Sequence, residues 1–261
     1  SMQKKSTEVL QSKYQRDALR APNADNAALE GDDAGDARAT TQPDVLESSL
    51  QIFRDVIQTS GTAEAIKITG RSSEQAWQRT KAMLELKRDV EKRAVGLFPA
   101  VARAVSTAPK TASIAQHIYT NALVGVGGAV AAHTSGLPTT AITTGTNRAF
   151  TKDLVEAACQ ACYTTAGTVP PLAVMSPAHK VAFSAFTGLS HIRENTPLAS
   201  TGEAEIHNGA EWYRGNFGRL RVQAHYMMVG AEHVLMLDQK WNDFMFLRGW
   251  TTLPLGRTGD S

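Results

Sequence analysis

The sequence predicts an α+β protein that begins with a long polar region. Three observations support this class: few large apolar residues before about residue 48, a helical repeat between residues 73 and 97, and two-residue alternation over 220–228. No segment repeats, and the expected helices come before a run of strands instead of alternating regularly with them. This order is typical of an α+β fold.

The composition is that of an ordinary globular protein. Hydrophobic residues make up 42% and charged residues 20% of the chain, close to average usage. No stretch reaches the roughly 18–20 apolar residues of a membrane span, and the polar residues after Met2 predict no signal peptide. The formal charge, 27 minus 25 or +2, is too balanced to indicate a dedicated nucleic-acid binder. Two cysteines make no disulfide framework and indicate a reducing compartment.

The first part of the chain is expected to be an extended arm or a long loop. Residues 1–48 have too little apolar surface to fold alone. Their larger apolar side chains are sparse: Val9, Leu10, Tyr14 and Leu19. A group of carboxylates in this stretch is expected to be solvated rather than to bind a cation: Glu30, Asp32, Asp33 and Asp36.

The next segment, Leu50–Ile57, is apolar but ambiguous. Leu50, Phe53 and Ile57 fit one face of a helix, whereas alternate apolar residues in the same segment fit a strand. Periodicity alone leaves both possibilities open.

Residues 73–97 form the clearest predicted helix, about 37 Å long at the usual rise per residue. Ser72 and Gln75 fit a capping box. One apolar stripe repeats every seven residues and is widened by two neighbours: Ala76, Met83, Val90 and Leu97, with Trp77 and Leu84. Opposite charges at helical spacing predict three ion pairs: Lys81/Glu85, Lys87/Glu91 and Asp89/Arg93. Such a helix is either a solvated surface helix or one that lies along a neighbouring subunit.

Two shorter helices and a buried strand are predicted in the middle of the chain. Residues 122–145, rich in Gly, Ala and Thr, indicate strand and loop. Thr151 can cap a helix that runs to about Thr165 and stops at Gly167. The apolar residues 171–175 predict a short strand, and Ser176-Pro177 then starts a third helix. Its apolar positions are Val181, Ala182, Phe186 and Leu189.

The last third of the chain predicts strands. Apolar and polar residues alternate from Leu220 to Met228, as in a half-buried strand. Two further apolar runs, residues 234–237 and 244–247, indicate more strands.

No catalytic, cofactor-binding or metal-binding site is predicted. Cys159 and Cys162 form a C-x-x-C pair, but on one helix face with Val155 they indicate buried small hydrophobes. A zinc site is not expected, because His179 and His191 are twelve residues apart. Residues 188–192 begin like a nucleophile elbow but have isoleucine in place of the second glycine, and the glycine-rich residues 124–129 match no phosphate-binding motif.

Several short segments, in this order, resemble a family of tailed-phage major capsid proteins. At the N-terminal end these are residues 14–24 (YQRDALRAPNA) and 30–34 (EGDDA). They are followed by QIFRD at 51–55, SGTAEA at 60–65, GRSSE at 70–74 and ELKRDVE at 85–91. Near the C-terminal end are NFGRL at 216–220, LD at 237–238, LR at 247–248 and GRTGD at 256–260.

The resemblance implies the Hong Kong 97 (Johnson) capsid fold. Expected domains are an N-terminal arm remnant (1–13), an E-loop (14–70), a P-domain spine helix region (71–111), an A-domain (112–235) and a return to the P-domain (236–261). Leu50–Ile57 is then expected to be the returning strand of the E-loop hairpin. The expected assembly residues, on the spine helix and the E-loop, are Arg54, Lys81, Glu85, Lys87, Arg88, Asp89, Glu91 and Arg93.

The same resemblance implies a structural protein and not an enzyme. It implies a shell of hexamers and pentamers that encloses double-stranded DNA through non-specific contacts, with scaffolding, portal or decoration proteins as further partners and no membrane. The subunit is expected in the virion after synthesis in the bacterial cytoplasm. An encapsulin-like nanocompartment shell and, less favoured, a thiol-dependent enzyme remain as alternatives.

Two departures from the family pattern carry expectations of their own. Relatives usually have more residues before the E-loop than the dozen that precede Tyr14, and a shortened arm is expected to weaken assembly. Some relatives join subunits through isopeptide bonds from an E-loop lysine. No lysine lies between Lys13 and Lys67, so no such bond is expected from this loop tip.

Overall fold

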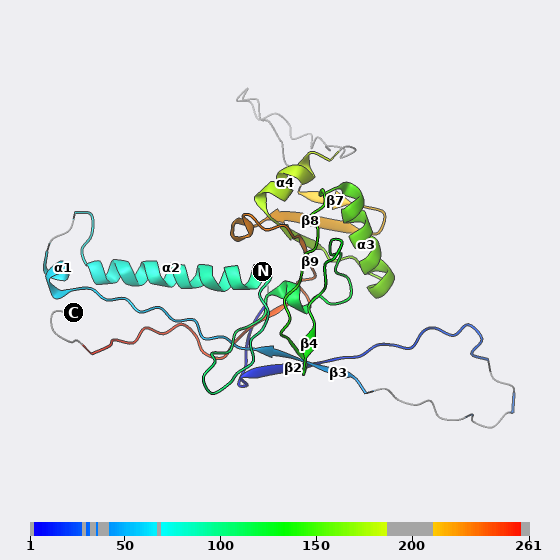
Figure 1. The fold of residues 1–261 in the computed structure, drawn as a ribbon, viewed down its shortest axis with the longest axis horizontal. Helices are drawn as coiled ribbons and strands as arrows, with labels where there is room; N and C mark the ends of the chain where they lie inside the picture. The colour runs from blue at the N-terminus through cyan, green and yellow to red at the C-terminus, as the bar shows by residue number, and fades with distance from the viewer. Residues whose placement is uncertain are drawn as a thin grey trace, which may run out of the picture.

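The computed structural model describes residues 3–27, 30–31, 35, 42–66, 69–186 and 211–256 (Figure 1). In these ranges the strands are β1 (Gln3–Ser6), β2 (Gln11–Arg16), β3 (Asp44–Ser49), β4 (His133–Thr134), β5 (Leu137–Pro138), β6 (Leu172–Met175), β7 (Trp212–Arg214), β8 (Arg219–Ala224), β9 (Leu235–Leu237) and β10 (Asp243–Phe246). The helices are α1 (Gly61–Ala65), α2 (Glu74–Val95), α3 (Lys152–Ala166) and α4 (Pro177–Ser184), with two 3₁₀ turns, η1 (Ile114–His117) and η2 (Tyr226–Met228). This mixture confirms the predicted α+β class.

The body of the molecule is a four-stranded mixed sheet with the order β7-β8-β6-β9. β6 runs parallel to β8 and antiparallel to β9, and β7 runs antiparallel to β8. α3 and α4 pack on one face of this sheet. Their apolar faces and the inward residues of the sheet form the main core: Val155, Cys159, Ala173, Met175, Phe183, Tyr213, Leu220 and Val222.

A second, smaller core joins the sheet to the end of α2. Met228, Leu235 and Leu237 are buried here with Ala115. Val174 of β6 packs against them, as do Val95 and Leu97 at the end of the long helix. Val174 pairs with Leu235, so this core covers the β6–β9 side of the other sheet face.

The predicted caps of the two middle helices are confirmed. The Thr151 side chain accepts a hydrogen bond from Leu154 N, and Gly167 ends α3 in the left-handed conformation. Ser176 caps α4, with Pro177 in its first turn. α4 is shorter than predicted, because it ends at Ser184 and leaves Phe186 beyond the helix; Leu189 lies outside the described residues.

The predicted capping box of the long helix is wrong by one residue. Ser73, not Ser72, is the N-cap, and its hydroxyl accepts from Ala76 N at 3.2 Å. Arg71 fixes the first turn from outside through an ion pair with Glu74 at 2.7 Å.

The polar N-terminal region contains a hairpin, but its second strand is not the predicted one. β2 and β3 pair antiparallel from Gln11↔Ser49 to Arg16↔Asp44. Leu50–Ile57 was expected to be the returning strand; instead residues 50–59 are extended and have no strand partner among the described residues. The register explains this correction, because β2 begins opposite Ser49 and the chain then runs past the end of its partner.

The C-terminal strand prediction also needs one correction. Alternation predicted a strand to Met228, but β8 ends at Ala224 and residues 226–228 form a 3₁₀ turn. Met228 N donates to the His225 carbonyl, which turns the chain so that Met228 enters the smaller core. The two later strands are confirmed as β9 and β10, and β10 pairs in parallel with β1 at the other end of the sequence.

Candidate assembly surface

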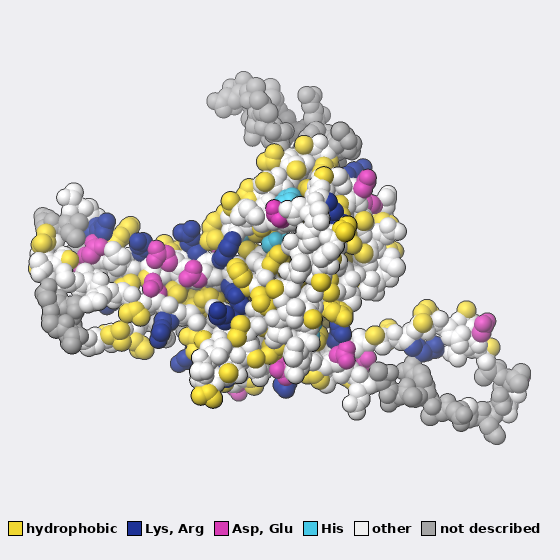
Figure 2. All heavy atoms as spheres, in the orientation of Figure 1, with side chains coloured by type: hydrophobic (Ala, Val, Ile, Leu, Met, Phe, Trp, Pro, Cys, Tyr) yellow, Lys and Arg dark blue, Asp and Glu magenta, His cyan; other side chains and the backbone are white. Residues whose placement is uncertain are grey.

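α2 projects from the body and has no buried residue along its 22 positions (Figure 1). An amphipathic helix in a globular protein normally buries its apolar stripe against a core. Here Trp77, Met83 and Leu84 stay 50%, 44% and 56% exposed. Figure 2 shows hydrophobic side chains interspersed with charged ones along the projecting part of the molecule. The described residues thus leave the first half of the predicted stripe uncovered, whereas Val90 is partly buried and Leu97 packs in the smaller core.

Two extended segments accompany the helix and enclose a large groove with it. Residues 50–59 and 247–256, far apart in sequence, run on the same side of the body as α2 (Figure 1). The groove continues into the body along η1, α3 and β9, and the whole space has a volume of about 2310 Å³. Pockets for small ligands usually measure about 300–1,000 Å³, so a space of this extent fits a polypeptide better than a small molecule. Helix residues that line it include Met83, Leu86 and Val90.

The first extended segment has the side-chain pattern of a half-buried strand. Phe53 and Ile57 are partly buried, while Ile52 and Val56 are 70% and 62% exposed. Leu50 N donates to the Leu10 carbonyl at 3.3 Å, and beyond Leu50 no described strand pairs with the segment. The segment therefore resembles the edge strand of a sheet. Its unpaired backbone N–H and C=O groups can form hydrogen bonds with another extended chain.

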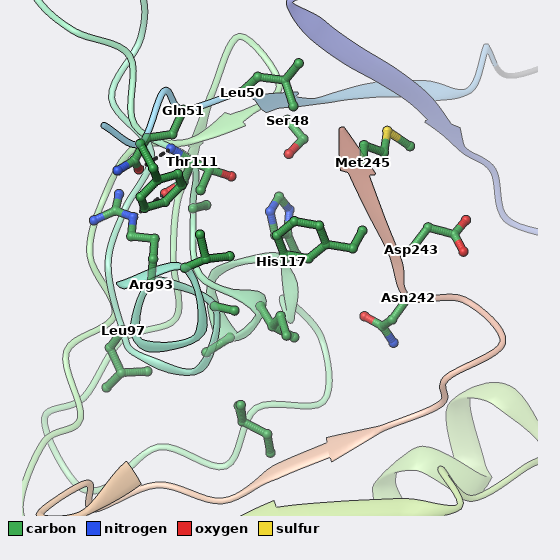
Figure 3. A pocket seen from close by; sticks show the side chains of 18 of the residues that line it. Ser48, Leu50, Gln51, Arg93, Leu97, Thr111, His117, Asn242, Asp243 and Met245 are labelled. Atoms are coloured by element: carbon green, nitrogen blue, oxygen red, sulfur yellow. Dashed lines mark hydrogen bonds between the residues drawn. The ribbon is translucent and has the colours of Figure 1, made fainter. Parts of the chain in front are cut away.

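The base of the groove is held together by Arg93 (Figure 3). Its Nε donates to the Thr111 carbonyl at 2.6 Å, and a terminal nitrogen donates to the Pro99 carbonyl at 2.7 Å. Thr111 N in turn donates to the Gln51 side-chain oxygen at 3.3 Å. Partial burial lowers the pKa of Arg93, although an arginine stays charged. The network ties α2 to the start of the extended segment.

Only one of the three predicted ion pairs on α2 forms. Lys81 and Glu85 approach to 3.7 Å at an exposed position, where such a pair contributes little. Glu91 instead accepts a hydrogen bond from the Tyr226 hydroxyl at 2.8 Å. The predicted Lys87/Glu91 and Asp89/Arg93 pairs are therefore wrong. Glu91 bonds to Tyr226 instead, and Arg93 bonds to the Thr111 and Pro99 carbonyls.

The predicted assembly residues separate into two groups. Arg93 donates hydrogen bonds to two carbonyls of its own subunit, and Glu91 accepts a hydrogen bond from Tyr226 of η2. The other predicted residues are exposed and remain available to a partner: Arg54, Lys81, Glu85, Lys87, Arg88 and Asp89. Whether they contact another subunit stays a prediction.

Sequence reasoning missed the apolar residues of the C-terminal segment. Trp250 is 43% exposed, and Leu253 and Leu255 are 78% and 72% exposed. Bulky apolar side chains between glycines and a proline were the available signal, since such a segment has no core of its own to enter.

The described residues offer little for enzyme chemistry. Burial raises the pKa of Cys159 to about 11 and also raises the pKa of Cys162, so neither thiol is an activated nucleophile. Cys159 is buried as predicted, and Cys162 is half-buried. Within the described part of the chain, no three His, Cys, Asp or Glu side chains gather as a metal site. Residues 188–192 lie outside the described residues, as do Asp32, Asp33 and Asp36. None of the described helices has the length and apolar character needed to cross a membrane.

Comparison with known proteins assigns the chain to a family. The profile of the SU10 major capsid protein family matches residues 1–261, the whole sequence. The chain belongs to this family. It is also similar to the major capsid protein of Escherichia phage Phieco32, with 39% identity over 80 residues. That match covers 30% of this chain and 22% of the relative, about a fifth of its length. The family is one of phage major capsid proteins, which are components of the virion.

Proposed function

We propose that this member of the SU10 family is the self-assembling shell subunit of a tailed phage or prophage. Copies would form hexamers and pentamers and then an icosahedral shell around double-stranded DNA. The observation that carries the proposal is the uncovered groove formed by α2 and the two extended segments. Scaffolding, portal and decoration proteins are further expected partners, and synthesis takes place in the bacterial cytoplasm.

The proposal includes the Hong Kong 97 (Johnson) architecture. The β2–β3 hairpin corresponds to the E-loop, α2 to the spine helix and the four-stranded sheet with α3 and α4 to the A-domain. The β1–β10 pair supports a P-domain built from both ends of the chain. The predicted domain boundaries are kept in this proposal with two shifts: β1 joins the P-domain, and the A-domain extends through β9 to Leu237.

Burial of apolar surface supplies the driving force for assembly. Each Å² of apolar surface removed from water contributes about 25 cal/mol, and α2 leaves Trp77, Met83 and Leu84 exposed. In a closed shell every subunit makes several such contacts at once, so weak individual contacts add to a stable particle.

The decisive experiment is negative-stain electron microscopy of the purified chain with light scattering for mass. Closed shells or flat hexamer sheets are expected. Met83→Glu and Leu86→Glu, which place a charge on the groove face of α2, should reduce assembly strongly while leaving the subunit folded. Thr80→Glu, an exposed position of the same helix, is the matched control. Equal assembly of all variants would contradict a role for the groove, and monomers under all conditions would contradict the shell.

The family assignment does not favour the nanocompartment alternative. A genetic test separates the two, because a phage capsid gene has portal and terminase genes beside it. Denaturing gels of assembled particles should show single subunits and no covalent ladders, since residues 14–66 contain no lysine.

A further inference from the structure

One part of the four-stranded sheet has a face on which no described element packs. α3 and α4 cover one side, and the smaller core covers the β6–β9 half of the other side. On β7 and β8, alternate residues point away from the main core and are exposed. These are Trp212, Arg214, Arg219 and Arg221, here called the arginine face.

The strand register brings these four side chains together. Trp212 is opposite Arg221, and Arg214 is opposite Arg219. The Arg219 guanidinium lies 3.8 Å from the centre of the Trp212 ring, and that of Arg221 lies 6.0 Å away. Like charges directly opposite each other destabilise a strand pair. The fold therefore concentrates positive charge at a cost, which an anionic partner would offset.

No carboxylate of the described residues neutralises this cluster. None of its three arginines takes part in an ion pair in the described structure. The nearest acidic residue in sequence, Glu211, interacts electrostatically with Lys180 of α4, on the core side of the sheet. Among the described residues, the three arginines of this face are thus exposed and make no ion pair.

We propose that the arginine face binds the phosphodiester backbone of nucleic acid without sequence specificity. Guanidinium groups match phosphate oxygens in a two-pronged geometry, and an exposed tryptophan offers a plane for a base or sugar. Arg219 and Arg221 are two residues apart on one strand, about 6.8 Å, so their guanidinium groups are far enough apart to contact different phosphate groups. The inference rests on the proposed function in one respect: a shell that encloses DNA supplies this ligand.

The test uses the full chain and two probes, a duplex of about 20 base pairs and a single strand of about 20 thymidines, titrated from about 50 to about 200 mM salt. Replacement of Arg214, Arg219 and Arg221 by glutamine should weaken binding at least about tenfold at the lower salt concentration. It should also reduce the magnitude of the slope of log K against log salt concentration, by about 2.7 for the duplex and about 2.1 for the single strand. Trp212→Ala should weaken binding of the single strand about tenfold and binding of the duplex much less.

A charge-matched control replaces three exposed lysines elsewhere, Lys110, Lys152 and Lys240, by glutamine. This variant should bind as the original chain does. Equal binding by both triple variants would overturn the proposal, as would equal retention of polyglutamate, which would indicate an acidic protein surface instead. If the triple arginine variant does not fold, single Arg219→Gln and Arg221→Gln variants should each lower the duplex slope by about 0.9. Electron microscopy of the same preparations tests assembly separately, so that failure to assemble and failure to bind DNA are distinguishable.

Discussion

The sheet body and α2 are built from similar apolar residues but use them differently. In the body, Met175 and Phe183 are 1% and 0% exposed. On α2, Met83 and Trp77 are 44% and 50% exposed, and no position of the helix is buried. One region is stabilised by its own core, whereas the apolar side chains of the other remain exposed in the single subunit. The comparison shows that similar apolar residues are buried only where other elements of the chain pack against them.

The largest expected effect is in the body. Phe183→Ala removes a side chain with no exposed surface from the centre of the main core. Such substitutions cost about 3–5 kcal/mol through lost burial and the remaining cavity. Urea unfolding followed by circular dichroism measures it, and a loss below about 1 kcal/mol would show that the body is not the stable unit.

Two methionines, one in each region, test the comparison directly. Met175→Ala should cost about 2–5 kcal/mol, because the residue is buried in β6. Met83→Ala should cost less than about 1 kcal/mol in the isolated chain, because the side chain already contacts water. In an assembly measurement the order should reverse, with Met83→Ala raising the critical concentration for shell formation. Similar unfolding costs at the two positions would contradict the distinction.

The connection between the two regions depends on Arg93. Arg93→Met keeps most of the apolar stem but removes the donors to the Thr111 and Pro99 carbonyls. A loss of about 2 kcal/mol in the free energy of unfolding is expected. Arg79→Met, an exposed position of the same helix, should change it by less than about 0.5 kcal/mol.

The smallest effect is a pH dependence at the base of the hairpin. His117 Nδ1 lies 3.2 Å from the Tyr14 hydroxyl, and His133 of β4 lies nearby. Burial lowers the pKa of His117, with a further decrease from the charge of His133. Burial and then Arg16 lower the pKa of His133. The folded state thus favours neutral imidazoles.

Because the unfolded chain takes up these protons first, the free energy of unfolding should fall as pH drops below about 6.5 and level off below the folded-state pKa values. Urea unfolding at about pH 7.5 and about pH 5.5 measures this change. A His117→Gln, His133→Gln double variant should show a smaller change in unfolding free energy between the two pH values. The change that remains comes in part from His233, whose pKa burial also lowers. The same change in the double variant as in the original chain would show that the two histidines do not contribute.

Local signals predicted much of the fold. Thr151, Gly167 and Ser176-Pro177 marked the ends of α3 and α4 because caps depend on residues within a turn of one another. The helical repeat predicted the apolar stripe of α2, but the exposure of Trp77, Met83 and Leu84 is known only from the structure. The returning strand was misplaced by a few residues, since Asp44–Ser49 is polar and carries little apolar pattern, and its position depends on pairing with β2.

The balanced net charge concealed the arginine face. A charge of +2 over the whole chain gave no indication of a basic surface. Arg214 and Arg219 are five residues apart in sequence and face each other only because β7 and β8 pair in one register. A count over the chain cannot show such a local concentration.

The sequence by itself determined the α+β class, the long helix with its apolar stripe, the caps of α3 and α4 and the burial of Cys159. Each of these depends on residues close together in the chain, where hydrogen bonding and periodicity act directly. Only the tertiary structure decided that Arg93 holds two distant carbonyls, that Glu91 pairs with Tyr226, and that the extended segments form a groove with α2. Those outcomes depend on which distant segments pack together. Charged side chains at the same helical spacing therefore form ion pairs with each other in one case and bond to residues of other elements in another.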